Sequence, residues 1–429
     1  MSLRPGKKGG KNDEASGATQ GLTADETSKA ESRLSKFATR CIAGLAMVFG
    51  SLSVIYAGHG WVIIMVMLVQ VQVFREMLAV RYKQAKEKEI PLFRTTMWVW
   101  FFVAMQWSYG GVSVRLLKIA GFIQGEAQAL RYHTWISFGL YSAVFVVTVA
   151  TMRKGSVKYQ IGQLCWTIVT LCMVVLQTDS ITTNIFRGLW WFVFPLSLVI
   201  TNDVFAYFTG FCIGRKFTKR PFLPFISPNK TWEGFVGGLV FTCMFGMFVP
   251  LLANYTWAQW FICPATPRSG VNSLATLFVP SPKHVLRCET PLIFQPASYE
   301  VGIPRMIMAD ASVSLQLMPM QIHGLGLAIY ASLVAPWGGF FASAIKRAYN
   351  KKDFDSFIPG HGGLTDRMDC QFIMALAAFV HYNTFVRATG GESLLHTSDE
   401  IMQAVGMLAL DQQQELYAKL GAALGVGRG

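Results

Sequence analysis

The stretch "GLWWFVFPLSLVITNDVFAYFTG", residues 188–210, decides the fold class, because its twenty-three residues include a single charged side chain. A helix of this length is long enough to cross the hydrocarbon core of a bilayer, which is roughly 30 Å thick. The segment therefore predicts a transmembrane helix. Its one acid, Asp203, lies beside Asn202 toward the end of the segment. An acid inside an apolar span is costly to insert into a membrane.

The same apolar pattern recurs along the whole chain. Hydrophobic residues make up 52% and charged residues only 14% of the sequence, whereas soluble domains carry roughly a quarter charged residues. We expect an all-α polytopic membrane protein with about nine transmembrane helices, and between eight and ten. The predicted spans lie near residues 41–58, 60–77, 95–112, 133–152, 157–177, 188–210, 233–253, 321–345 and 370–388.

The distribution of basic residues predicts the orientation in the membrane. If the N-terminus is cytosolic, the loops facing the cytosol hold nineteen Lys and Arg residues, and the first three opposite loops hold four. Lys and Arg are enriched in the cytosolic loops of membrane proteins, so we expect a cytosolic N-terminus. The same bias accounts for the net charge of +14, and no nucleic-acid partner is expected.

Three segments differ from the transmembrane domain that we expect over residues 40–389. Residues 1–39 are polar and predict a disordered cytosolic tail. Residues 254–320 form a long insertion on the lumenal side, and they contain Cys263 and Cys288; the sequence leaves open whether these two form a disulfide. Residues 390–429 have helix-forming composition and predict a tail with an interfacial helix.

Two polar segments stand at the ends of predicted spans. Asn202 and Asp203 either make buried structural hydrogen bonds or contribute to a binding or metal site. In "ISPNKTWEG", residues 226–234, Ser227 predicts a helix N-cap with proline after it, and Lys230 adds a charge that favours anions there. An ordinary helix start with a snorkelling lysine is the alternative. Glu233 stands beside them.

A third polar segment, "SAIKRAYNKKDFDSFIPGHGGLTDRMDCQ", covers residues 343–371. Ser343, Lys346 and Arg347 are spaced so that they share one face at the end of a helix. Further on, Gly362 and Gly363 allow backbone N–H groups to approach a ligand closely.

Asp366 and Asp369 stand three residues apart where the last predicted span begins. Their carboxylates lie together if this turn is helical, and paired carboxylates are suitable ligands for Mg²⁺, which completes its shell with water and substrate phosphates. The three polar segments together predict a site at the cytosolic rim for a polyphosphate, a divalent cation and a lipid.

The residues of this third segment closely resemble the signature of the phosphatidate cytidylyltransferases, also called CDP-diacylglycerol synthases. The signature runs from a serine through Lys-Arg and Lys-Asp to His-Gly-Gly and Asp-Arg-x-Asp. "SPNKTWEG" and "NDVFAYFTG" resemble further blocks of this family. The match is close over residues 200–371, and the eukaryotic-type layout of spans extends it back to about residue 40. Asp355 departs from the signature, which usually has a small residue there; it either faces solvent or enlarges the acidic cluster.

The resemblance implies transfer of a cytidylyl group from CTP to phosphatidate, with Mg²⁺, giving CDP-diacylglycerol and pyrophosphate. The implied catalytic residues are Lys346, Arg347, Lys352, Asp353, His361, Asp366 and Asp369. The implied metal ligands are Asp353, Asp366 and Asp369. The implied substrate-binding residues are Asp203, Ser227, Asn229, Lys230, Glu233, Ser343, Gly362, Gly363 and Arg367.

Other functions fit the sequence less well. A CTP-dependent polyprenol kinase would need similar groups but would release CDP. A transporter would place its polar residues near the middle of the bilayer, and here most stand at one rim. The resemblance implies the endoplasmic reticulum as the membrane and a cytosol-facing site, and it leaves a homodimer open.

Overall fold

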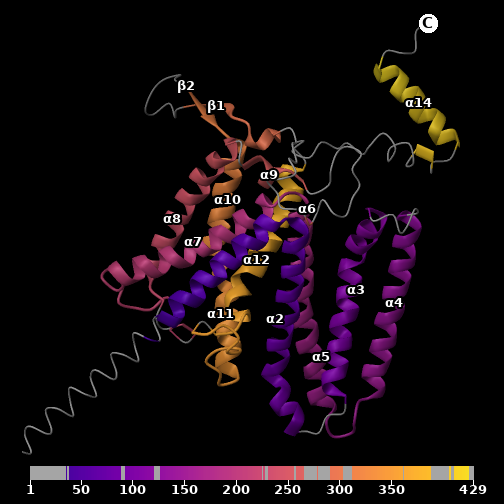
Figure 1. The fold of residues 1–429 in the computed structure, drawn as a ribbon, viewed down its shortest axis with the longest axis vertical. Coiled ribbons are helices and arrows are strands. Elements are labelled where there is room, and N and C mark those ends of the chain that lie inside the picture. Colours follow the sequence, from indigo (N-terminus) through magenta and orange to yellow (C-terminus); the bar gives the residue numbers. More distant parts are fainter. Residues whose placement is uncertain are drawn as a thin grey trace, which may run out of the picture. The chain divides into compact units, whose positions relative to one another are not determined.

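The structure is a computed structural model in which most of the chain is helical (Figure 1). The residues that it describes are 38–87, 92–119, 126–224, 226–227, 230–255, 258–264, 290–302, 312–360, 362–387 and 410–424, with residues 35, 278, 405 and 406. These residues belong to two compact units. The first comprises Met1–Cys288 and Gln321–Phe379, and the second comprises Glu289–Met320 and Val380–Gly429.

The first unit begins with a helix over Ala38–Ala57. The elements that follow in it are α2 (His59–Glu87), α3 (Phe93–Ile119), α4 (Glu126–Ala150), α5 (Val157–Leu171), a π-helical turn (Cys172–Leu176), α6 (Gln177–Phe186), α7 (Trp190–Ile213), α8 (Trp232–Phe248), a 3-10 turn (Val249–Asn254) and α9 (Gln259–Ile262). Two pairs of long helices make extensive contacts: α3 packs along α4, and α7 packs along α8.

The chain after α9 contains both helices and strands, and its residues Gln321–Phe379 also belong to the first unit. Its elements are a 3-10 turn (Leu292–Phe294), β1 (Ala297–Gly302), β2 (Ser312–Leu317), α10 (Pro319–Leu333), α11 (Pro336–Ala348), α12 (Thr365–His381), a π-helical turn (Tyr382–Val386) and α14 (Leu410–Leu424).

Seven of the nine predicted spans coincide with helices that are long and apolar enough to cross a membrane, counted over the described residues. The two other predicted spans are also helical, as α3 and α12. α3 is less apolar, because Gln106, Ser108, Gly110 and Gly111 lie within it, and α12 has only 17 residues.

Many large apolar side chains on these helices point away from the protein interior. On α7, Tyr207, Phe208 and Phe211 are 77%, 58% and 80% exposed. A water-soluble protein rarely exposes such a continuous apolar surface, whereas a bilayer solvates it. The chain is therefore an integral membrane protein.

The helix that matches the predicted span 321–345, Pro319–Ala348, is interrupted by a short turn. α10 ends at Leu333 and α11 begins at Pro336. Proline has no N–H and its ring clashes with the carbonyl four residues earlier, so it breaks a continuous helix. The break makes α11 a short separate helix with Lys346 and Arg347 in its last turn.

An apolar cluster fixes the end of α11 and the chain that follows it. Val73 and Met77 of α2 pack there with Ile345 of α11, Phe354 of the following loop and Phe372 of α12. Phe354 is only 4% exposed. The loop between α11 and α12 is therefore anchored to α2 by burial of an aromatic ring.

The insertion 254–320 contains the antiparallel hairpin of β1 and β2, with Ala297 opposite Leu317 and Gly302 opposite Ser312. The described membrane-spanning elements are all helices, in agreement with the expected all-α polytopic architecture, and this hairpin is confined to the insertion. Cys263 is disulfide-bonded, and Cys288, the partner whose pairing the sequence left open, lies outside the described residues. In the C-terminal tail, α14 confirms that the segment forms a helix. Its position at the membrane interface stays a prediction.

A close crossing of α8 and α10 gives a test of the fold. A Cβ atom on Gly246 would lie 2.7 Å from the carbonyl oxygen of Gly324. We expect Gly246→Leu to destabilise the protein by about 1–3 kcal/mol, because the two backbones must separate. Thermal unfolding in detergent measures this change.

Gly50→Leu is the matched control, since a Cβ atom on Gly50 meets nothing within 4 Å. Equal melting temperatures for the two variants would contradict this crossing.

Candidate active site

The three polar segments of the sequence meet in the first unit. Asp203 on α7 has Lys230 and Arg367 among its electrostatic neighbours, and Asp369 has Asp203 and Lys346 among its own. Residues separated by more than 160 positions in the sequence therefore share one electrostatic environment. The helices α7, α11 and α12 and the segment before α8 bring them together.

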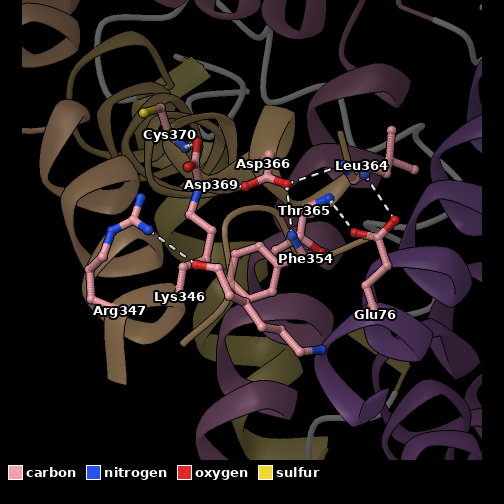
Figure 2. A network of polar contacts seen from close by, with 11 residues as sticks. Glu76, Lys346, Arg347, Phe354, Leu364, Thr365, Asp366, Asp369 and Cys370 are labelled. Carbon is pink, nitrogen blue, oxygen red and sulfur yellow. Dashed lines mark hydrogen bonds and ion pairs between the residues drawn. The ribbon is translucent and has the colours of Figure 1, made fainter. Parts of the chain in front are cut away.

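Asp366 lies at the centre of the polar network (Figure 2). Its Oδ1 is 2.6 Å from Nζ of Lys346, and these side chains are 7% and 12% exposed. Its Oδ2 accepts hydrogen bonds from the N–H of Phe354 and the N–H of Gly363, both at 3.1 Å. One carboxylate therefore joins the end of α11, the following loop and the chain that enters α12.

Glu76 is a second buried acid at the same loop, and the sequence analysis missed it. It lies on α2 with 1% exposure. Its two carboxylate oxygens accept from the N–H of Leu364 at 2.9 Å and the N–H of Thr365 at 2.8 Å (Figure 2). The signal was present, because an acid in a predicted span is as unusual at Glu76 as at Asp203.

The two glycines have a different use from the one predicted. The N–H of Gly362 donates to the carbonyl of Ile358 at 3.2 Å, and the N–H of Gly363 donates to Asp366. Gly362 has φ of 83°, which favours glycine. A Cβ atom on Gly363 would lie 2.7 Å from Oε2 of Glu76. Both glycines therefore allow the loop to close on itself, with their N–H groups already bonded within the protein.

The cations at the end of α11 differ in their partners. Lys346 binds Asp366 and also lies 5.6 Å from the centre of the Phe354 ring. Arg347 is exposed and donates to the carbonyl oxygen of Lys351 at 3.2 Å. Ser343 is half-buried. Lys352 is exposed, with no hydrogen bond or ion pair to the described residues, which leaves its charge open to a ligand.

The segment before α8 corrects one prediction. The N-cap of α8 is Thr231, whose hydroxyl accepts from the N–H of Gly234 at 3.2 Å. The predicted N-cap, Ser227, instead belongs to a tight turn in which its N–H donates to the carbonyl of Leu223 at 2.9 Å. Both hydroxyl residues suit a helix start, and the helix begins at the later one.

Lys230 and Glu233 lie in different surroundings. Lys230 is exposed with its Nζ 4.8 Å from the centre of the Phe340 ring. Glu233 is buried and accepts from the N–H groups of Arg215, Phe217 and Thr218 at 2.7–3.1 Å. The carboxylate of Glu233 therefore holds the turn after α7. Asn229 and His361, two further predicted site residues, lie outside the described residues.

Asn202 and Asp203 also differ in their exposure to solvent. Asn202 is 5% exposed, and a Cβ atom on Gly238 would be 2.8 Å from its Oδ1, so it packs between α7 and α8. Asp203 is exposed, and Arg367 is exposed too. The buried structural interpretation therefore fits Asn202, and the binding interpretation fits Asp203.

Asp355, which departs from the signature, lies on the exposed side of the loop. Its Oδ2 is 3.5 Å from Nη2 of Arg75, and the side chains are 41% and 51% exposed. Exposed ion pairs of this kind contribute little to stability. The solvent-facing interpretation of Asp355 therefore fits the structure.

Among the aspartates of residues 351–371, Asp353 and Asp369 are the best suited to a cation. Asp353 is exposed and makes no hydrogen bond to the described residues. Asp369 accepts at Oδ1 from the N–H of the adjacent Cys370 at 2.7 Å and also accepts from the Cys370 side chain. No group of three His, Cys, Asp or Glu side chains in the described part of the chain is arranged to hold a metal. Mg²⁺ requires only one or two protein carboxylates, so these two acids fit such a site, whereas Asp366 has both oxygens engaged.

Because Lys346 is paired with Asp366, two lysines of the segment should contribute differently to the stability of the protein. Lys346→Met leaves a buried carboxylate without its cation, and we expect a loss of about 3–5 kcal/mol in stability. Lys352→Met removes an exposed lysine and should leave the melting temperature unchanged. Equal melting temperatures for the two variants in detergent would show that the ion pair does not hold the loop.

Comparison with known proteins identifies the family of this chain. Residues 38–385 match the model of the Cytidylyltransferase family. A protein of Dictyostelium discoideum described as a probable phosphatidate cytidylyltransferase is 40% identical over 396 residues, covering 92% of this chain and 79% of that protein. Phosphatidate cytidylyltransferase 1 of Homo sapiens is 36% identical, covering 91% and 79%, and the phosphatidate cytidylyltransferase of Saccharomyces cerevisiae is 37% identical, covering 83% and 74%. The chain therefore belongs to the cytidylyltransferase family and, within it, to the phosphatidate cytidylyltransferases.

Proposed function

We propose that this membrane nucleotidyltransferase transfers the cytidylyl group of CTP to phosphatidate, releases pyrophosphate and depends on Mg²⁺. The observation that carries the proposal is a loop with exposed cations and carboxylates at the ends of membrane helices, in a chain of this family. The names of the relatives support CTP and phosphatidate as the substrates.

The reaction needs charge neutralisation more than proton transfer. A phosphate oxygen of phosphatidate attacks the α-phosphorus of CTP, a new P–O bond forms, and the bond from the α-phosphorus to the bridging oxygen breaks to release pyrophosphate. The attacking oxygen is already anionic near neutral pH. The task of the protein is therefore to bring two anions together and to align the attacking and leaving oxygens.

The exposed cations fit the nucleotide. Lys352 and Arg347 present charges at the loop surface that match the triphosphate, while Lys346 is held back by Asp366 at 2.6 Å. Lys346 therefore acts mainly on the shape of the loop, and it adds to the positive potential that attracts CTP.

The lipid headgroup fits the side of the site formed by α7 and the segment before α8. Lys230 and Arg367 lie near Asp203, next to the apolar surface that includes Tyr207 and Phe211. A headgroup phosphate can bind to the cations there while its acyl chains remain in the bilayer.

Asp353 and Asp369 would hold Mg²⁺, because Asp353 makes no hydrogen bond to the described residues and the hydrogen bonds of Asp369 come from the adjacent Cys370. When bound, the ion would neutralise charge on the triphosphate and make the pyrophosphate a better leaving group. Asp366 is less suited, because both of its oxygens are already bonded to Lys346, Phe354 and Gly363.

The disulfide in the insertion supports the endoplasmic reticulum as the compartment of the protein. Cys263 is disulfide-bonded, and disulfides persist in oxidising compartments such as the endoplasmic reticulum lumen. A lumenal insertion and a cytosolic N-terminus agree with the distribution of Lys and Arg. We therefore place the site on the cytosolic side of this membrane.

The activity is tested with purified protein in detergent, supplied with CTP, phosphatidate and Mg²⁺. We expect equal amounts of pyrophosphate and a cytidine-bearing lipid, and we expect EDTA to stop their formation until Mg²⁺ is returned in excess. Formation of CDP and a phosphorylated polyprenol in place of these products would refute the proposal.

Asp369→Asn tests the metal assignment separately from folding. The amide oxygen can still accept from the N–H of Cys370, so the melting temperature should remain that of the wild type. Turnover should fall on the order of 100-fold or more, because a charge that stabilises the transition state is lost. Near-normal turnover at saturating Mg²⁺ would remove Asp369 from the metal site.

A further inference from the structure

Glu76 is a buried acid with no cation beside it in the described part of the chain. Its carboxylate accepts three hydrogen bonds, from the side-chain amide of Gln72 at 3.2 Å and from the N–H groups of Leu364 and Thr365. A buried carboxylate without these donors would carry a large desolvation cost. The contacts therefore hold Glu76 and the start of α12 together strongly.

The donors come from the part of the chain that enters α12. The first N–H groups of a helix have no partner within the helix, and the helix dipole favours a negative charge at that end. Glu76 accepts hydrogen bonds from two N–H groups at this helix start, those of Leu364 and Thr365. Asp366 accepts from the N–H of Gly363, just before the helix, and from the N–H of Phe354 in the loop. Two carboxylates from different helices thus bind the loop from both sides.

Two independent features indicate that the contact is built into the fold. A Cβ atom on Gly363 would be 2.7 Å from Oε2 of Glu76, so the carboxylate needs a glycine at that position. Val73 and Met77, on the same helix as Glu76, bury Phe354 of the loop. Helix α2 therefore sets both the depth of the loop, through Phe354, and its register, through Glu76.

We propose that Glu76 is a positioning residue for the reaction, which fixes the loop of residues 351–365 in the conformation that binds CTP. The inference rests on the proposed function, because the loop carries Lys352 and Asp353. Glu76 itself is buried beneath the loop and contacts backbone, so it acts through these residues and not on the substrate.

Glu76→Gln tests the proposal. The amide keeps one oxygen to accept a hydrogen bond, but its NH₂ group faces the second backbone N–H, where both groups are donors. The loop then occupies its binding conformation only part of the time, and the apparent affinity for CTP falls by that fraction. We expect KM for CTP to rise roughly 10-fold, while kcat at saturating CTP stays within about 3-fold of wild type.

Hydrogen exchange provides a second measurement that needs no substrate. Peptides covering residues 351–365 should exchange faster in Glu76→Gln, whereas peptides from α7 and α8 should not change. Glu76→Asp keeps the charge and should restore part of both properties. Asp355→Asn, the matched loss of an exposed carboxylate from the same loop, should leave KM and exchange at wild-type values.

The outcomes separate positioning from folding. A fall in kcat at unchanged KM, with faster exchange throughout the first unit, would mean that Glu76 only stabilises the fold, and it would overturn the proposal. Unchanged exchange in residues 351–365 would overturn it as well. If the wild type makes no cytidine-bearing lipid, the proposed function fails, and the exchange data alone then decide whether Glu76 holds the loop.

Discussion

The bonds of Asp366 are the constraint on which the candidate site depends. Its carboxylate contacts Lys346 at the end of α11, Phe354 in the loop and Gly363 just before α12. These segments bear most of the chemistry predicted for the chain. A single side chain with three partners thus decides where the exposed Lys352 and Asp353 are presented, although it has little freedom left to bind a ligand itself.

Burial explains why acids do this work. A loop that is neither helix nor strand leaves backbone N–H groups without partners, and those buried away from water must be bonded by other groups of the protein. Glu76 and Asp366 satisfy them between α11 and α12, and Glu233 does the same for the turn after α7. The same solution occurs at two irregular segments, which suggests that buried carboxylates are the means by which this fold keeps its loops ordered.

The sequence predicted what depends on local composition. Apolar runs identified seven spans that the structure confirms as suitable helices, and polar residues within them identified segments that meet near Asp203 and Asp369. It could not predict partners distant in the chain: Glu76 and Thr365 are separated by 289 positions. It also placed the N-cap wrongly at Ser227 instead of Thr231, because both residue types stabilise a helix start and the outcome depends on the turn at Leu223.

The four aspartates of residues 351–371 show why a motif does not assign roles by residue type. Hydrogen bonds to charged groups contribute about 1.5–3 kcal/mol each, so a cation that recruited Asp366 would first have to replace its bonds to Lys346, Phe354 and Gly363. Asp353 makes no hydrogen bond to the described residues, the hydrogen bonds of Asp369 come from the adjacent Cys370, and Asp355 faces solvent beside Arg75. The acid that is bonded to three separate segments therefore shapes the loop, and the chemistry falls to Asp353 and Asp369, whose bonds join no distant parts of the chain.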